Sequence, residues 1–343
     1  MGKTILITGG AGFIGSCFVR RIFREYPDWR ILVLDALTYA GNPENFPKEM
    51  KESNRFEFWY GNINNIILVD ELISRSDAVV HFAAESHVAR SIFDNRIFFE
   101  TDVMGTQTIA NAVLKYKKRI ERFIHISTSE VYGTALREPM DEDHPIMPLT
   151  PYAAAKAGAD RLVYSYIVTY KLPAIIIRPF NNYGPYQHLE KAVPRFVTSA
   201  ILDEPLTIHG NGLAARDWIY VEDVAEAVDL ALHADLKKIQ GQVINLGTGI
   251  AVSILDLAKK ILQLMNKPES LLSCIPDRPG QVDKQISSTD KIQRLLGFQP
   301  KTKLEQGLEK TIDWYQENRD WWEPLRWMRT VPILTEEGKQ ERY

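Results

Sequence analysis

The chain has 343 residues, of which 45% are hydrophobic and 25% charged, a composition typical of a globular protein rather than a disordered or fibrous one. Its formal net charge of -3 at pH 7 provides no overall attraction to nucleic acids or to anionic membranes. Its two cysteines, Cys17 and Cys274, lie far apart and lack the spacing of a metal site, so neither a disulfide framework nor a bound metal is predicted.

The N-terminal residues run directly from Met1 into an apolar strand, without the basic and long apolar segments of a secretory signal. No stretch reaches the roughly 18–20 apolar residues that a membrane-spanning helix needs. We therefore expect a cytoplasmic protein that binds neither membranes nor nucleic acids.

The first half of the chain alternates short apolar runs with helical segments, the first of them expected from about Gly12 to Glu25. The apolar runs are Thr4–Thr8, Ile31–Leu34, Ala78–Phe82, Phe123–Ser127 and Ala174–Arg178. Continuous apolar strands separated by helices are typical of a parallel sheet that is covered on both faces. The pattern predicts a doubly wound α/β domain over residues 1–180.

After residue 180 the pattern changes to more frequent turns and shorter elements. Helices are expected near Glu222–Leu232 and Ile254–Met265, and a strand near Val243–Leu246. We predict a smaller α/β lobe over residues 181–325 and a C-terminal tail over 326–343, with a surface helix and a loose end. The strand near residues 243–247 is expected to return to the first sheet.

Glycines follow the first apolar run at spacings of three and open the first helix. They let the chain turn tightly and let a pyrophosphate approach backbone N–H groups at the helix N-terminus. Asp35 follows the second strand, where a carboxylate accepts hydrogen bonds from ribose hydroxyls and repels a 2′-phosphate. The pattern favours NAD as cofactor, the alternatives being a structural glycine turn and a turn role for Asp35. The residues predicted to bind it here are Gly9, Gly12, Phe13, Ile14, Gly15 and Asp35.

Tyr152 and Lys156 lie one turn apart at the start of an expected helix, just after Pro151. The Lys156 ammonium, together with a positive nicotinamide ring, is expected to lower the pKa of the phenol and make Tyr152 a base. Such a pair is common by chance, but Ser127–Glu130 ends a strand just before it, at the edge where parallel sheets bind ligands.

These features resemble the extended short-chain dehydrogenase/reductase family, over nearly the whole chain. Within it the sequence is most similar to nucleotide-sugar 4,6-dehydratases, particularly the dTDP-glucose 4,6-dehydratases. The motifs that carry the resemblance are Leu34–Asn42, Ala83–Val88, Asn181–Tyr186, Glu190–Lys191, Arg216–Trp218 and Asp277–Gly280. The resemblance implies an NAD-binding Rossmann domain, a nucleotide-sugar-binding lobe, and a homodimer formed through helices near Thr101–Lys115 and Tyr152–Tyr170.

The resemblance also implies a reaction on a nucleotide-diphosphate hexose. Tyr152 takes the proton of the 4-hydroxyl, which Thr128 holds, while hydride passes from C4 to NAD. Glu130 then removes the acidified C5 hydrogen, the 6-hydroxyl leaves as water, and hydride returns to C6. Lys156 holds the nicotinamide ribose.

Ser129 departs from this pattern, because the dTDP-glucose enzymes typically have an aspartic acid there that protonates the departing hydroxyl. A serine hydroxyl is too weak an acid for that step, so Glu130 is the alternative donor, with Ser129 orienting the group. The Thr-Ser-Glu turn also resembles UDP-glucuronate decarboxylases and GDP-mannose 4,6-dehydratases, so decarboxylation and C4 epimerisation remain open. A two-substrate reductase and a non-catalytic NAD-binding module are further alternatives.

Other positions are assigned to the site by the matching motifs. Asn62, Ile63 and Ala83 are expected near the cofactor, with Asn62 at a position where an aspartic acid is usual. Further departures are Gln281 and Gln285. The residues expected to bind the substrate are Glu85, Ser86, Asn181, Lys191, Arg216 and Arg278. For each of them, an ordinary role at the surface or in a loop is the alternative.

Overall fold

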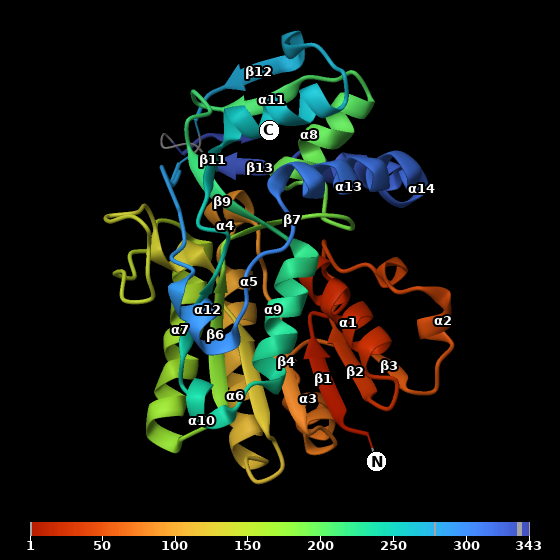
Figure 1. The fold of residues 1–343 in the computed structure, drawn as a ribbon, viewed down its shortest axis with the longest axis vertical. Coiled ribbons are helices and arrows are strands. Elements are labelled where there is room, and N and C mark those ends of the chain that lie inside the picture. Colours follow the sequence, from red (N-terminus) through yellow and green to blue (C-terminus); the bar gives the residue numbers. More distant parts are fainter. Residues whose placement is uncertain (1, 278, 335–337, 343) are drawn as a thin grey trace.

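The computed structural model describes residues 2–277, 279–334 and 338–342 and shows a sheet domain joined to a smaller lobe (Figure 1). The sheet domain contains a seven-stranded parallel sheet in the order β10-β6-β5-β4-β1-β2-β3. Its strands are β1 (Thr4–Thr8), β2 (Arg30–Asp35), β3 (Phe56–Tyr60), β4 (Ala78–His81), β5 (Arg122–Ile126), β6 (Ala174–Pro179) and β10 (Val243–Leu246).

Helices cover both faces of this sheet because alternate strand residues point to opposite sides and nearly all of them are apolar. One face packs against α1 (Phe13–Glu25), α9 (Val221–His233) and α12 (Asp290–Leu296). The other packs against α3 (Ile66–Ser74), α6 (Thr106–Lys115) and α7 (Pro151–Tyr170). The predicted doubly wound α/β fold is confirmed.

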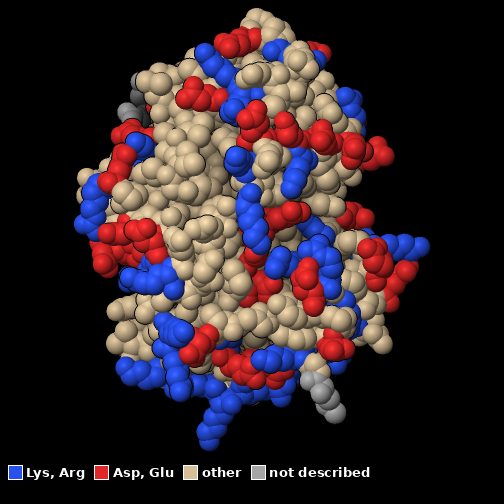
Figure 2. Space-filling view, viewed as in Figure 1, with Lys and Arg blue, Asp and Glu red and all other residues tan. Residues whose placement is uncertain are grey.

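Short helices occupy the connections of the sheet domain. They are η1 (Pro43–Asn45), α2 (Lys48–Lys51), α4 (Val88–Phe93), α5 (Arg96–Phe98), the π-helical η2 (Phe99–Gly105), η3 (Ser129–Tyr132) and α10 (Leu236–Ile239). Within the described part of the chain, no helix is both long and apolar enough to cross a bilayer. On the face drawn in Figure 2, acidic and basic side chains are interspersed over both the sheet domain and the lobe.

The second half of the chain does not stay in the lobe predicted for residues 181–325. β10 pairs with β6 at the edge of the large sheet, and α9 packs beside α1. Ile292 and Phe298 are likewise buried in the core beneath that face. The lobe is therefore interrupted twice, because residues 221–246 and 290–298 are needed to cover the first sheet.

The lobe has its own small sheets and hydrophobic core. The sheets are β11-β9-β7, made of β7 (Asn181–Tyr183), β9 (Ala215–Tyr220) and β11 (Ala251–Ser253), and β12-β8, made of β8 (Leu206–His209) and β12 (Leu272–Ile275). The helices are α8 (Ala192–Ile201), α11 (Ile254–Leu264), η4 (Glu269–Leu271), α13 (Leu304–Glu317) and α14 (Arg319–Trp322).

The described part of the C-terminal tail packs on the lobe instead of forming a loose end. Trp322, just before it, is fully buried and donates its indole N–H to the Tyr315 carbonyl at 2.7 Å. Arg329, the last residue of η5 (Glu323–Arg329), pairs with Glu204 at 2.9 Å. Strands β13 (Pro332–Leu334) and β14 (Gln340–Arg342) pair with each other, and β13 packs against α4, where Val331 and Ala89 are buried together.

A buried ion pair fastens α7 to β6 directly behind the strand ends. The Arg178 guanidinium donates to both oxygens of Asp160, at 2.8 and 2.9 Å, and to the Tyr132 hydroxyl at 2.7 Å. Burial alone raises the pKa of Asp160, but the hydrogen bonds and charge of Arg178 hold it below its usual value. The pair therefore connects the helix that carries Tyr152 with the turn that ends in Tyr132.

Removing one partner of this pair is expected to destabilise the protein strongly. In Arg178→Met the Asp160 charge stays buried without its main partner, so the free energy of unfolding should fall by about 3–5 kcal/mol. Urea unfolding measures the loss. The double variant Asp160→Asn/Arg178→Met serves as the control. Its free energy of unfolding should fall by less than that of the single variant, because no buried charge is left without a partner. An equal or larger fall contradicts the role given to the ion pair.

Candidate active site

A cleft of about 410 Å³ lies between the carboxyl ends of the parallel strands and the lobe. All but one of the predicted site residues line it, because the connections after successive strands meet at the same sheet edge. The exception is Arg278, which lies outside the described residues. No group of three or more His, Cys, Asp or Glu side chains in the described ranges is arranged to hold a metal ion.

The glycine turn forms a cradle at the start of α1. Gly9 has a φ of +68°, and a Cβ there would lie 2.5 Å from the Ala83 backbone nitrogen. A Cβ at Gly15 would lie 2.2 Å from the Gly9 carbonyl oxygen. Gly12 is the N-cap of α1 and makes no side-chain hydrogen bond to the first N–H groups of the helix. Gly12, Phe13 and Ile14 line the cleft, so the helix N-terminus faces it. This backbone fits a pyrophosphate, which needs N–H groups and no side chain in the way.

Asp35 is held in a fixed orientation at the end of β2. Its two oxygens accept hydrogen bonds from the Ala11 N–H at 2.9 Å and the Leu37 N–H at 2.8 Å. Burial raises the pKa of Asp35, and these two hydrogen bonds oppose the rise. Nearby, the Asn62 side-chain oxygen accepts from the Asn64 N–H at 2.8 Å. The Asp35 carboxylate therefore has a fixed position in the cleft beside the glycine turn, as expected for a group that binds the ribose of a dinucleotide.

The start of α7 places Tyr152 and Lys156 inside the cleft. Thr150 caps the helix by accepting the Ala153 N–H at 3.2 Å, and Pro151 occupies its first turn. One turn later, the Lys156 ammonium donates to the Ile126 carbonyl at the end of β5, at 2.8 Å. Thr128, beyond that strand end, is a hydrogen-bond partner of the Tyr152 phenol.

The groups of the chain by themselves raise the pKa of Tyr152, whereas the predicted lowering also involves a positive nicotinamide ring. Burial is the main cause of the raised pKa, the charges of Asp102 and Glu130 add to it, and the hydrogen bond with Thr128 opposes it. Burial lowers the pKa of Lys156 itself, against the charges of Asp102 and Asp160. Sequence spacing predicted that the two groups meet but did not reveal the burial that dominates their ionisation.

Ser129 and Gln285, two of the departures noted in the sequence, contact each other. The Ser129 hydroxyl donates to the Gln285 side-chain oxygen at 3.0 Å, and the Gln285 amide donates to the carbonyls of Ser129 and Gly133, each at 3.2 Å. Both residues are almost fully buried. Among the described residues, the adjacent Glu130 carboxylate has no hydrogen-bond partner and lines the cleft. Glu130 is therefore the carboxyl group available for proton transfer.

The residues expected to bind substrate lie on the lobe side of the cleft. The Lys191 ammonium at the start of α8 donates to the Ser86 carbonyl at 2.7 Å, joining the lobe to the loop after β4. In that loop the Glu85 N–H donates to Asp102 at 2.8 Å. Arg216 lines the cleft from β9, and Asn181 begins β7.

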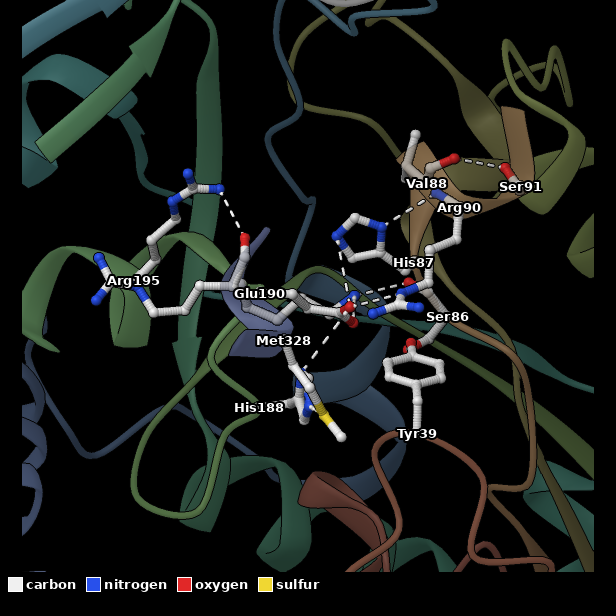
Figure 3. A network of polar contacts seen from close by, with 12 residues as sticks. Tyr39, Ser86, His87, Val88, Arg90, Ser91, His188, Glu190, Arg195 and Met328 are labelled. Atoms are coloured by element: carbon white, nitrogen blue, oxygen red, sulfur yellow. Dashed lines mark hydrogen bonds and ion pairs between the residues drawn. The ribbon is translucent and has the colours of Figure 1, made fainter. Parts of the chain in front are cut away.

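Glu190 is a cleft residue that the sequence-based selection missed. Its carboxylate is surrounded by Arg90 at 3.1 Å, His87 at 3.7 Å and His188 at 3.9 Å, as Figure 3 shows. Burial raises its pKa, against the charges of Lys191 and Arg90. The only signal in the sequence was its place beside Lys191 in a matching motif.

Comparisons with known proteins extend over nearly the whole chain. The family model described as GDP-mannose 4,6 dehydratase matches residues 6–311. A dTDP-glucose 4,6-dehydratase of Streptomyces niveus is 40% identical over 326 residues, which cover 94% of this chain and 95% of that protein. The low-salt glycan biosynthesis protein Agl12 of Haloferax volcanii is 43% identical, over 91% of this chain and 98% of its own length.

Solved structures show the same relationship. The dTDP-glucose 4,6-dehydratase DesIV of Streptomyces venezuelae, with NAD and TYD bound, has a TM-score of 0.89 at 39% identity, over 94% of this chain and all of that chain (100%). A UDP-glucuronic acid 4-epimerase from Bacillus cereus, in complex with UDP-glucuronic acid and NAD, has a TM-score of 0.86 at 30% identity, over 92% of this chain and 99% of that chain. The chain therefore belongs to the GDP-mannose 4,6 dehydratase family, and the predicted resemblance to nucleotide-sugar 4,6-dehydratases is confirmed.

Proposed function

We propose that this protein is an NAD-dependent nucleotide-sugar 4,6-dehydratase, a lyase that forms a 4-keto-6-deoxyhexose nucleotide. The observation that carries the proposal is the meeting of Tyr152, Lys156 and Glu130 in one cleft, beside a glycine turn that fits a dinucleotide. The dehydratases among its relatives and structural neighbours support the same reaction.

The first step is assigned to Tyr152, whose phenolate accepts the proton of the substrate 4-hydroxyl. Thr128, its hydrogen-bond partner, favours the phenolate and is assigned to hold that oxygen. NAD, held by the glycine turn, Asp35 and Lys156, supplies the hydride acceptor at C4 and returns the hydride to C6.

The second step is assigned to Glu130. Its carboxylate takes the C5 proton that the new ketone has acidified, and the same proton then goes to the 6-hydroxyl as the C6–O bond breaks. The hydroxyl leaves as water. When the hydride returns to C6, C5 takes up a proton that replaces the one lost from it, and the proton that Tyr152 took from the 4-hydroxyl balances this uptake. Glu130 suits both halves of this exchange because its carboxylate lines the cleft and has no hydrogen-bond partner in the described part of the chain.

Replacing Ser129 is expected to have a small effect on turnover. Its hydroxyl is engaged with Gln285, so Ser129→Ala should lower kcat by less than about tenfold and stability by about 1 kcal/mol, the value of one hydrogen bond. Steady-state kinetics and urea unfolding of the same preparation measure both. A fall in kcat of a hundredfold or more in a folded Ser129→Ala protein assigns the proton to Ser129 and contradicts the role given to Glu130.

The nucleotide end of the substrate is assigned to the lobe. Lys191 and Arg216, with Arg278, provide cations for the diphosphate. A second cavity of about 130 Å³ shares His87 and Glu190 with the cleft and extends it towards Arg195 and His209. With the hexose against Tyr152, the nucleoside is assigned to this extension.

Products distinguish this function from its alternatives. Purified protein with NAD is incubated separately with dTDP-glucose, UDP-glucose, GDP-mannose and UDP-glucuronate. Mass spectrometry then measures the masses of the product nucleotide sugars. A 4,6-dehydratase gives loss of water from one of the hexoses. Loss of carbon dioxide from UDP-glucuronate indicates a decarboxylase, an isobaric C4-inverted sugar an epimerase, and no change with any substrate a non-catalytic module.

A cytoplasmic homodimer is proposed for the assembled protein. The helices expected to pair, α6 and α7, and the adjoining α5 and η2 expose large apolar side chains at Ile97, Met104, Tyr164 and Val168. Burying such side chains favours association with a second copy. Cys17 and Cys274 are both free thiols, which suits a reducing compartment. Sedimentation equilibrium tests the dimer.

A further inference from the structure

Asp102 lies beside the catalytic turn of α7 in the π-helical segment η2, and it is completely buried. Two contacts place η2 and its neighbour α5 against that helix. The Phe98 ring stands edge-on to the Tyr152 ring with centroids 6.2 Å apart. A Cβ on Gly158 would lie 3.3 Å from a Val103 methyl carbon, so a glycine permits the close approach. π-helical turns often occur at functional sites.

The Asp102 carboxylate is only half satisfied. One oxygen accepts the Glu85 N–H at 2.8 Å, whereas the other is buried and has no hydrogen-bond partner in the described ranges. An unpaired buried carboxylate oxygen costs free energy, which favours a role beyond structure. The carboxylate interacts electrostatically with both Lys156 and Tyr152.

The charges that face Asp102 come from two other elements. Lys156 and Tyr152 lie on α7, and Glu85 lies in the loop after β4. Burial raises the pKa of Asp102 to about 7, Lys156 and the Glu85 N–H oppose the rise, and the Glu85 charge adds to it. Asp160, one turn beyond Lys156 on α7, also acts on the Lys156 ammonium but is itself paired with Arg178. The Glu130 charge in η3 also raises the pKa of Tyr152, and the buried rings of His81 on β4 and His125 on β5 interact with the Lys156 charge.

We infer that Asp102 is a positioning residue that keeps Lys156 protonated and opposes ionisation of Tyr152, so that its charge sets the working pH of the pair. This inference rests on the proposed function only in its prediction for the pH dependence of kcat/KM. Removing the negative charge stabilises the phenolate and destabilises the ammonium, so both groups titrate at lower pH. Asp102 is not expected to touch the substrate, because it does not line the cleft.

The test is the titration of Tyr152 in the NAD-bound protein. Tyrosinate absorbance is recorded against pH for Asp102→Asn, and the same variant carrying Tyr152→Phe is subtracted to remove the other tyrosines. Asn retains an oxygen acceptor for the Glu85 N–H, and the Tyr152 titration should fall by about one pH unit. Both limbs of the kcat/KM profile should move to lower pH with it.

Asp223→Asn is the matched control, since Asp223 is also buried and accepts one backbone N–H, from Thr302 at 3.0 Å, but does not line the cleft. It should leave the Tyr152 titration unchanged. Asp102→Ser is a second charge-free variant, should Asp102→Asn not fold. An unchanged Tyr152 titration in either folded variant overturns the inference. Absence of turnover in the unsubstituted protein refutes only the proposed function, because the titration of Tyr152 needs no substrate.

Discussion

Tyr152→Phe is expected to lower kcat by about 10²–10⁴-fold while leaving the fold and NAD binding intact. The phenol is buried in the cleft with Thr128 as its hydrogen-bond partner, and the hydroxyl is the only group that the substitution removes. Lys156 cannot take the proton of the 4-hydroxyl in its place, since it donates to the Ile126 carbonyl and is assigned to the charged state. Steady-state kinetics with the best nucleotide hexose measures the loss.

Tyr166→Phe is the matched control for this experiment. Tyr166 lies on the same helix, but its hydroxyl donates to Asn111 at 2.5 Å and it does not line the cleft. Its replacement should leave kcat unchanged. Tyr152→Phe activity within tenfold of the unsubstituted protein would show that another group is the base.

Glu130→Gln is expected to stop dehydration without stopping the oxidation at C4. The amide cannot accept the C5 proton, so formation of the 4-keto-6-deoxy product should fall by about 10²–10⁴-fold. The first step does not use Glu130, so a 4-keto-hexose nucleotide and the absorbance of the reduced cofactor should build up in a single turnover. Stopped-flow absorbance and mass spectrometry of quenched samples separate the two steps.

The control is Glu138→Gln, in the segment after η3. The Glu138 carboxylate pairs with Lys284 at 2.5 Å outside the cleft, so its neutralisation should change neither step. If Glu130→Gln blocks oxidation as strongly as dehydration, Glu130 acts in the first step and the division of roles between Tyr152 and Glu130 is wrong.

Much of the sheet domain could be predicted because five of its strands are continuous apolar runs buried on both faces. β3 was not predicted, since Phe56–Tyr60 is an edge strand with partly exposed side chains and carries no such run. The return of β10 to β6 was expected, but the packing of α9 beside α1 was not. Helical periodicity identifies an apolar face without identifying the surface that it covers.

The candidate site was predictable where function depends on local spacing. Tyr152 and Lys156 on one helix, and the glycines between a strand and a helix, needed only the chain order. The contact of Ser129 with Gln285 joins residues far apart in the sequence, and the unpaired oxygen of Asp102 depends on how η2 packs against α7. Neither arrangement leaves a pattern in a single sequence, because both result from tertiary packing.

In the proposed reaction a hydride leaves C4 and returns to C6 of the same hexose. The measurement is a turnover with nucleotide hexose carrying deuterium at C4, followed by mass spectrometry and NMR of the product. We expect a 4-keto-6-deoxy product with the deuterium at C6 and no net consumption of NAD. Deuterium that remains at C4 of an inverted sugar, or that leaves on NADH, contradicts it.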